Sequence, residues 1–271
     1  MDWQSLRELL DKNERHLRSR KFKVPLRAII VALLSISIPQ TPALFAQTSL
    51  SSAKASAKIS LTGTWVSIVN EDWRWRMLTP QKGDYTSVPL NEEGRKVADA
   101  WDVSTDGSCK AYGVGGLMRM PTRVRIQWES EDVLRMETDS GLQVRHLYFA
   151  TPPAMQKRSL QGRSVASWEV AVPPGDGWGF GLASPSRPGG ALKVVTTDVQ
   201  EGWLRRNGVP YGENAVITEY YDTFTGPDNS KWFVVTTIVD DPQYLMVPFI
   251  TSSHFRQELG ESKWNPRPCK N

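Results

Sequence analysis

Hydrophobic and polar residues alternate along much of the chain after residue 60. In the stretch VRIQWE, Val124, Ile126 and Trp128 fall on one side, and the polar residues between them fall on the other. Such alternation is typical of a β-strand with one buried face. The turn ESED and the runs VLRMETD and LQVRHLYF follow at once, which predicts antiparallel hairpins. Further strands are expected near residues 72–78, 164–172, 191–199, 215–224, 231–240 and 246–257.

One helix is predicted within this β-rich region. In LNEEGRKVADAW, Asn91 can cap the helix, Glu92 and Glu93 occupy the first turn, and Val97 and Trp101 are four positions apart. Strands and helices do not alternate elsewhere, so a parallel sheet is not expected. About nine or ten strands with one short helix predict an all-β fold. We expect an antiparallel β-barrel, with a β-sandwich as the alternative.

The N-terminal segment differs from the rest of the chain. A basic stretch ends at Arg27, and the uncharged run that follows has a strongly apolar part of about 11 residues. This length suits the core of a signal peptide better than a membrane span, although a retained anchor is the alternative. We predict a signal peptide at 1–46, cleaved after Ala46, a flexible linker at 47–60 and one domain at 61–271. The mature protein would be periplasmic or secreted, with no stable membrane span.

The charge of the chain is concentrated in this N-terminal segment. Of 33 basic and 29 acidic residues, eight and four lie within 1–46, which leaves 25 of each in the remainder. Proteins that bind nucleic acid normally present a basic face. The neutral remainder therefore gives no reason to expect a nucleic-acid partner.

Cysteine and histidine are scarce. Cys109 and Cys269 are the only cysteines, and an exported protein is expected to pair them in a disulfide. Neither cysteine lies in a CxxC motif, and His146 and His254 have no ligand at metal-binding spacing. The sequence therefore predicts no metal site, and it gives no sign of a cofactor.

Two glycine-rich stretches are expected to be irregular. GVGGLM at 113–118 lacks the spacing of a nucleotide-binding loop, so we interpret it as a bulge or a tight strand bend. The stretch 173–190 is interpreted as a Pro/Gly-rich loop.

Two passages resemble known proteins. LTGTW at 61–65 resembles the opening strand of lipocalin-type barrels, which implies that Trp65 plugs the closed end and that Arg256 packs on it. The passages LKVVTTDVQEGWLRRNGVPYGENAVITEYY and WFVVTTIVDDPQYLMVPF are similar to a group of secreted, uncharacterised bacterial proteins. The matching positions are Thr196, Thr218, Glu219, Thr237, Asp241, Pro242, Pro248 and Phe249, with Tyr220 where Arg is common and Phe249 where Trp is usual. The resemblance implies a lipocalin-like barrel in the cell envelope and no known activity.

Glu219 is the acidic residue most expected to point inward, because it shares a strand face with Ile217 and Tyr221. An unpaired buried carboxylate is unfavourable, so it needs a partner, and the candidates are Arg119, Arg123 and Arg145. We favour a structural ion pair over a group that orients a ligand, and either over an acid/base catalyst. No catalytic residue is assigned.

The candidate binding region is the loop at 201–214, which we expect at the barrel mouth. We predict that the protein binds a small, partly apolar or sugar-like molecule in or at the mouth of the barrel. His146 is expected to face the interior. One alternative is an envelope enzyme that uses Glu219 and His146 as acid/base groups, and another is a non-catalytic structural or interaction protein. The candidate ligand-binding residues are Trp203, Arg205, Tyr211, Asn214, Glu219, Tyr221, His146 and Arg119.

Overall fold

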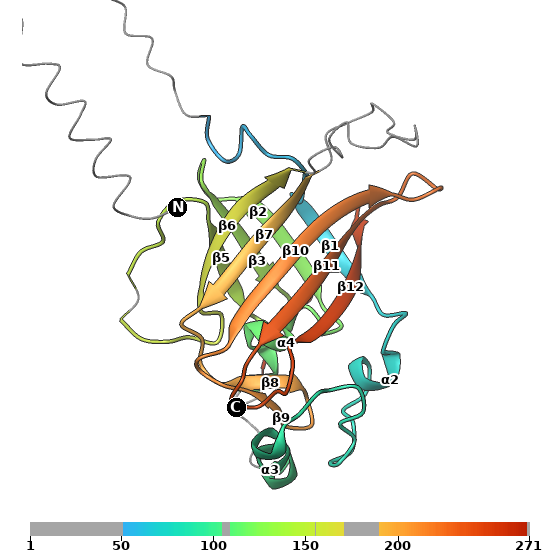
Figure 1. Cartoon of the computed structure of the whole chain (residues 1–271). Helices are drawn as coiled ribbons and strands as arrows, with labels where there is room; N and C mark the ends of the chain where they lie inside the picture. Colours follow the sequence, from blue (N-terminus) through green and yellow to red (C-terminus); the bar gives the residue numbers. More distant parts are fainter. Residues whose placement is uncertain (1–50, 105–108, 155, 171–189, 270–271) are drawn as a thin grey trace, which may run out of the picture. The chain divides into compact units, whose positions relative to one another are not determined.

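Nine β-strands close into a barrel in the computed structural model, which describes residues 51–104, 109–154, 156–170 and 190–269 (Figure 1). The first strand pairs with the second on one side and with the last on the other, and this closes the wall. The all-β barrel is therefore confirmed. Its strands are β1 (Gly63–Ile68), β2 (Arg123–Trp128), β3 (Val133–Thr138), β5 (Val144–Tyr148), β6 (Arg163–Val170), β7 (Gly190–Thr197), β10 (Val216–Thr225), β11 (Lys231–Asp240) and β12 (Phe249–Glu258).

The barrel strands follow one another around the wall in chain order, and all neighbours but one are antiparallel. The exception is β5 and β6, which pair in parallel with Leu147 opposite Ser164 and Tyr148 opposite Val165. The expectation of a wholly antiparallel barrel is wrong at this pair. Parallel neighbours need a crossover, so the chain between Tyr148 and Arg163 crosses from one end of the barrel to the other.

The alternation predicted from the sequence sets the interior of the barrel. On β10 every second side chain from Ile217 to Tyr221 is buried, and β11 alternates in the same way from Phe233 to Val239. The buried apolar residues form two clusters. One contains Leu61, Trp65, Met118, Val124, Ile126, Leu134, Met136, Leu147, Ala166, Leu192, Val194, Tyr221, Phe233, Val235 and Phe255. The other contains Tyr85, Val88, Leu90, Ala98, Val114, Val199, Leu204, Val209, Tyr211, Ala215, Ile217, Val239, Leu245 and Phe249.

The predicted helix is confirmed as α3 (Glu92–Ala100), and Asn91 accepts a hydrogen bond of 2.8 Å from the backbone N–H of Gly94. The strand predicted at 72–78 is wrong, because the chain there forms the short helix α2 (Trp73–Arg76). Asp72 has φ 52°, a left-handed conformation that ends any extended run, and its carbonyl accepts from Trp75 and Arg76.

The stretch GVGGLM is helical rather than a strand bend. The 3₁₀ turn η1 (Lys110–Tyr112) leads into α4 (Val114–Leu117), whose four residues are all buried. A Cβ atom on Gly116 would lie 2.5 Å from the carbonyl oxygen of Trp203. The glycines therefore allow α4 to pack directly against the neighbouring hairpin of β8 (Gly202–Arg205) and β9 (Val209–Tyr211).

The two ends of the barrel differ. We call the end with α4 and the β8–β9 hairpin the closed end, and the end with the β10–β11 hairpin the mouth (Figure 1). Residues 51–60 contact the mouth end. The backbone N–H of Ala53 donates to Asp132 over 2.8 Å, and the Trp168 indole donates to the Ala53 carbonyl over 2.8 Å. This part of the predicted linker therefore belongs to the barrel domain.

The C-terminal segment returns to the closed end. Trp264 lies against the outer wall, with its ring 4.7 Å from the Arg125 guanidinium, and β13 (Arg267–Pro268) pairs with β4 (Ser140–Gly141). The predicted disulfide is present between Cys109 and Cys269, whose Cα atoms lie 5.5 Å apart. Disulfides persist in oxidising compartments, which fits an extracellular protein.

Some expectations fall on residues that the structure does not describe. The predicted signal peptide at 1–46, the linker residues 47–50 and nearly all of the loop at 173–190 lie outside the described residues. Within the described ranges, no helix is long and apolar enough to cross a membrane.

We expect the double substitution Cys109→Ser and Cys269→Ser to lower the free energy of unfolding by about 2–5 kcal/mol, because the bond joins residues 160 positions apart and restricts the unfolded chain. Urea unfolding of both proteins measures this difference. Titration of the wild type under denaturing, non-reducing conditions is the control and should find no free thiol. An unchanged unfolding midpoint would show that the bond adds no stability.

Candidate functional site

A polar layer lies inside the barrel between the two apolar clusters. Its centre is an ion pair between Arg145 of β5 and Glu219 of β10, which are 2% and 0% exposed. The two Nη atoms of Arg145 donate to the two carboxylate oxygens over 3.1 and 2.6 Å, a bidentate arrangement. The predicted structural ion pair of Glu219 is therefore present, and its partner is one of the three arginines named from the sequence.

Hydroxyl groups complete this layer. The Tyr221 hydroxyl donates to Glu219 over 3.1 Å, and Arg145 Nη2 lies 3.4 Å from the hydroxyls of both Ser164 and Thr196. Burial alone would lower the pKa of Arg145, but the facing Glu219 carboxylate raises it above its usual value. Arg145 therefore stays charged, and Glu219 and Tyr221 serve the interior packing rather than an open site.

His146 does not face the interior as expected. It follows Arg145 on β5, so it points to the outer face, where its Nε2 lies 3.4 Å from Glu129. Glu219 is inside the barrel, so the two groups of the acid/base alternative lie on opposite faces of the wall. Within the described ranges, no three His, Cys, Asp or Glu side chains are placed to hold a metal ion.

The residues predicted from the loop at 201–214 separate into three environments. Tyr211 is fully buried in the core, and burial raises the pKa of its hydroxyl. Asn214 is exposed and accepts from Arg158 over 3.2 Å. Trp203 and Arg205 line a small cavity at the closed end together with Arg119. The loop is thus a packed hairpin at the closed end and does not form the mouth.

The middle of the barrel is filled by large side chains. Trp65 packs edge-on against Phe233 with ring centroids 5.0 Å apart, and Phe233 stacks on Phe255 at 4.6 Å. All three rings are at most 2% exposed. These rings leave no space for a ligand in the middle of the barrel, and the nearest open space lies beyond them, towards the mouth.

The mouth pocket lies there, and its volume is about 480 Å³. Small-molecule sites usually have volumes of about 300–1,000 Å³. Trp65 is among the lining residues, and the inward-facing positions of β10, β11 and β12 continue past the aromatic core as Thr223, Lys231 and Gln257. The pocket is lined by Ser60, Thr62, Trp65, Thr223, Phe224, Thr225, Lys231, Trp232 and Gln257.

The chemistry of the mouth pocket is mixed. Phe224 and Trp232 stack with ring centroids 5.9 Å apart at one edge. Hydroxyl and amide groups supply hydrogen bonds along the wall. Lys231 has no ion-pair partner among the described residues, so its ammonium group is free to meet a ligand. Such a pocket suits a molecule with an apolar or sugar ring and a negative or strongly polar group.

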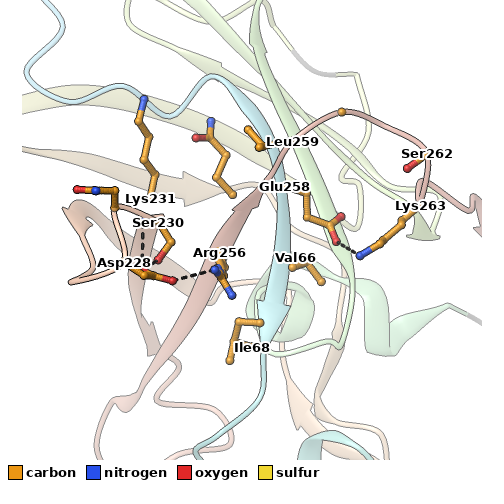
Figure 2. Close-up of a pocket in the computed structure, with 13 residues that line it drawn as sticks. Val66, Ile68, Asp228, Ser230, Lys231, Arg256, Glu258, Leu259, Ser262 and Lys263 are labelled. Carbon is orange, nitrogen blue, oxygen red and sulfur yellow. Dashed lines mark hydrogen bonds and ion pairs between the residues drawn. The ribbon is translucent and has the colours of Figure 1, made fainter.

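A larger groove of about 690 Å³ lies on the outer wall beside the mouth pocket (Figure 2). Val66 and Ile68 lie below a rim of charged side chains that pair with one another. Arg256 binds Asp228 over 3.0 Å, and Lys263 lies 3.7 Å from Glu258. Only Lys231 and Gln257 line both the groove and the mouth pocket. The other charged side chains of the groove are paired with one another, so the mouth pocket is the better candidate for binding a charged ligand.

The lipocalin resemblance implied that Arg256 packs on Trp65, and this expectation is wrong. Arg256 faces outward on β12 and lies over the Trp232 ring at 5.8 Å. Trp65 is buried, and its indole N–H donates to the Leu61 carbonyl over 2.8 Å. It lines the mouth pocket, so the expectation that it plugs the closed end is also wrong.

The residues of the mouth pocket were missed from the sequence, although a signal for them exists. Thr223, Lys231 and Gln257 stand two positions beyond the last buried aromatic residue on their strands. Polar side chains at inward positions near a strand end indicate the mouth of a barrel. The loop at 201–214, where we predicted the mouth, lies at the opposite end of the barrel.

We expect Arg145→Met and Glu219→Gln each to destabilise the fold by about 3–5 kcal/mol, because each leaves the other charge buried without a partner. The double variant should be more stable than the sum of the two losses predicts, by about 1–3 kcal/mol, because it buries no charge and keeps an acceptor for Tyr221. Urea unfolding of the four proteins gives this coupling energy. Losses that add within about 0.5 kcal/mol would mean that the pair does not act as a unit.

Comparisons with known protein families, with curated proteins and with solved structures find no match for this chain.

Proposed function

We propose that this protein is exported and binds a small, partly apolar molecule at the mouth of its barrel. The observation that carries the proposal is the mouth pocket, in which the unpaired Lys231 stands among hydroxyl groups near Trp65. The ligand would place an aromatic or sugar ring against the apolar side chains and a negative or strongly polar group near the ammonium. The filled interior limits the ligand to the mouth.

Two features support an exported binding protein. The disulfide between Cys109 and Cys269 fits an oxidising compartment, and the N-terminal segment has the charge and hydrophobic pattern of a signal peptide. The pocket stands on a rigid support, because the strands that carry its polar residues also carry the packed aromatic core. Rigid walls reduce the entropy lost when a ligand binds.

The packed interior also favours a second candidate, a structural or interaction protein without a small-molecule ligand. An acid/base enzyme based on Glu219 is less well supported, because Arg145 holds both carboxylate oxygens and His146 lies outside. Ligand binding at the mouth separates the two remaining candidates.

Binding of the dye 8-anilinonaphthalene-1-sulfonate tests the proposal, because the dye combines aromatic rings with an anionic sulfonate. We expect its fluorescence to rise with the wild-type protein in a saturable way. Lys231→Ala should weaken binding about three- to tenfold, since it removes a charge-assisted contact that is partly exposed to solvent. Thr223→Trp, which fills the pocket, should abolish binding.

Lys263→Ala is the matched control, because Lys263 lines the outer groove but not the mouth pocket, and its side chain is 71% exposed. It should bind the dye like the wild type. Equal effects of the Lys231 and Lys263 substitutions would place the dye elsewhere on the surface and contradict the proposal. Native mass spectrometry of protein isolated from its own host should also find a bound small molecule, and its absence together with a negative dye result favours the interaction protein.

A further inference from the structure

Three arginine side chains are buried together at the closed end of the barrel, away from the mouth pocket. Arg76 of α2, Arg119 after α4 and Arg205 of β8 are 2%, 5% and 4% exposed. Arginine is almost never fully buried unless its charge is paired. The hydrogen-bond and ion-pair partners of the three guanidinium groups therefore show whether their charges are fully paired by the protein.

Arg76 has a complete set of partners. Its Nη1 pairs with Glu71, its Nε donates to the Arg119 carbonyl over 2.8 Å, and its Nη2 donates to Ser67 over 3.1 Å. Burial, the largest influence, lowers the pKa of this guanidinium, and the nearby Glu71 opposes the change. Arg76 therefore needs no further ligand.

Only some of the N–H groups of Arg119 have a hydrogen-bond acceptor. Its Nη1 donates to Asp72 over 3.1 Å, and its guanidinium lies 5.6 Å from the Phe249 ring. Its buried Nη2 meets no acceptor in the described part of the chain. One donor of this side chain is therefore left over.

Arg205 has no hydrogen-bond partner among the described residues, since none of its three guanidinium nitrogens meets an acceptor. The guanidinium lies 4.6 Å from the Trp75 ring, and this cation–π contact stabilises the charge but accepts none of its N–H groups. Trp75 itself donates to Asp84 over 3.1 Å. A buried charge with five unmet donors is unfavourable, and the described residues around it offer no acceptor for them.

The charges that face this cluster do not balance. Glu71 and Asp72 offset Arg76 and Arg119, and Asp84 pairs with Arg74 over 2.7 Å. Two further groups lie nearby, Arg206, which donates to the Arg76 carbonyl, and the His254 ring, which contacts Glu71. Burial and then the charge of Arg119 lower the pKa of Arg205 to about 10, so the side chain is still protonated at neutral pH.

A cavity of about 10 Å³ adjoins both unsatisfied arginines. This volume holds about one water-sized particle. Its wall also includes Trp75, Gly116 and Trp203. A phosphate or a sulfate is too large for this space.

We propose that this cavity binds a single anion of halide size, held between the guanidinium groups of Arg205 and Arg119. A halide carries the negative charge that the cluster lacks and accepts several N–H groups at once, whereas a water molecule supplies no charge. Chloride is the natural candidate. Because this ion is larger than water, the long side chains of Arg205 and Arg119 must move apart slightly to admit it. The bound ion links α2, through Trp75, to the β8–β9 hairpin at the closed end.

Thermal unfolding tests the proposal when chloride replaces gluconate at constant ionic strength, with the protein produced in its own host. The midpoint of the wild type should rise by about 5–10 °C by the time chloride reaches a hundredfold excess over its dissociation constant, and it should keep rising with the logarithm of the chloride concentration. Arg205→Met should lose this dependence on chloride. The control is Arg256→Met, which removes an exposed arginine of the outer groove and should keep it.

Crystals of the wild type grown in bromide give a second measurement that needs no variant. An anomalous-scattering peak between Arg205 and Arg119 is the expected result. A chloride-dependent rise that persists in Arg205→Met, or bromide peaks confined to the surface, would overturn the proposal. A rise of equal size with sulfate that Arg205→Met also removes would overturn it as well, because the cavity is too small for that ion.

Discussion

The ion pair between Arg145 and Glu219 is the interaction on which the rest of the interior depends. Both side chains are excluded from water, so neither can change sides of the wall without leaving the other charge unpaired. The pair fixes β5 and β10 relative to each other across the barrel. It also lies between the two apolar clusters of the interior.

The two ends of the barrel carry different side-chain chemistry because different elements cover them. At the closed end, α4 and the β8–β9 hairpin cover the core and bury arginine side chains beneath it. At the mouth, the strands extend past the aromatic residues, and polar side chains face the space that remains. The proposed anion site and the proposed ligand pocket are consistent with one rigid wall between the two ends.

The sequence predicted the barrel, the capped helix, the disulfide and the inward position of Glu219, because each depends on local alternation or on a single pairing. It failed where a distant contact decided the outcome. The sequence predicts that His146 faces the interior on the same side of the strand as Leu142 and Val144. These two are 48% and 40% exposed, and Arg145 faces inward to meet Glu219. In the same way, the alternating Trp and Arg residues at 72–78 form a helix, in which Arg76 reaches the Arg119 carbonyl.

The single parallel pair of strands has a geometric origin. A closed ring of strands that alternate in direction must contain an even number, so a ring of nine must contain one pair that runs the same way. Only two residue pairs join β5 to β6, and a contact of Arg145 with Ser164 spans the same junction. This junction has the fewest paired residues of any in the barrel wall, so we expect the wall to open there first during local unfolding.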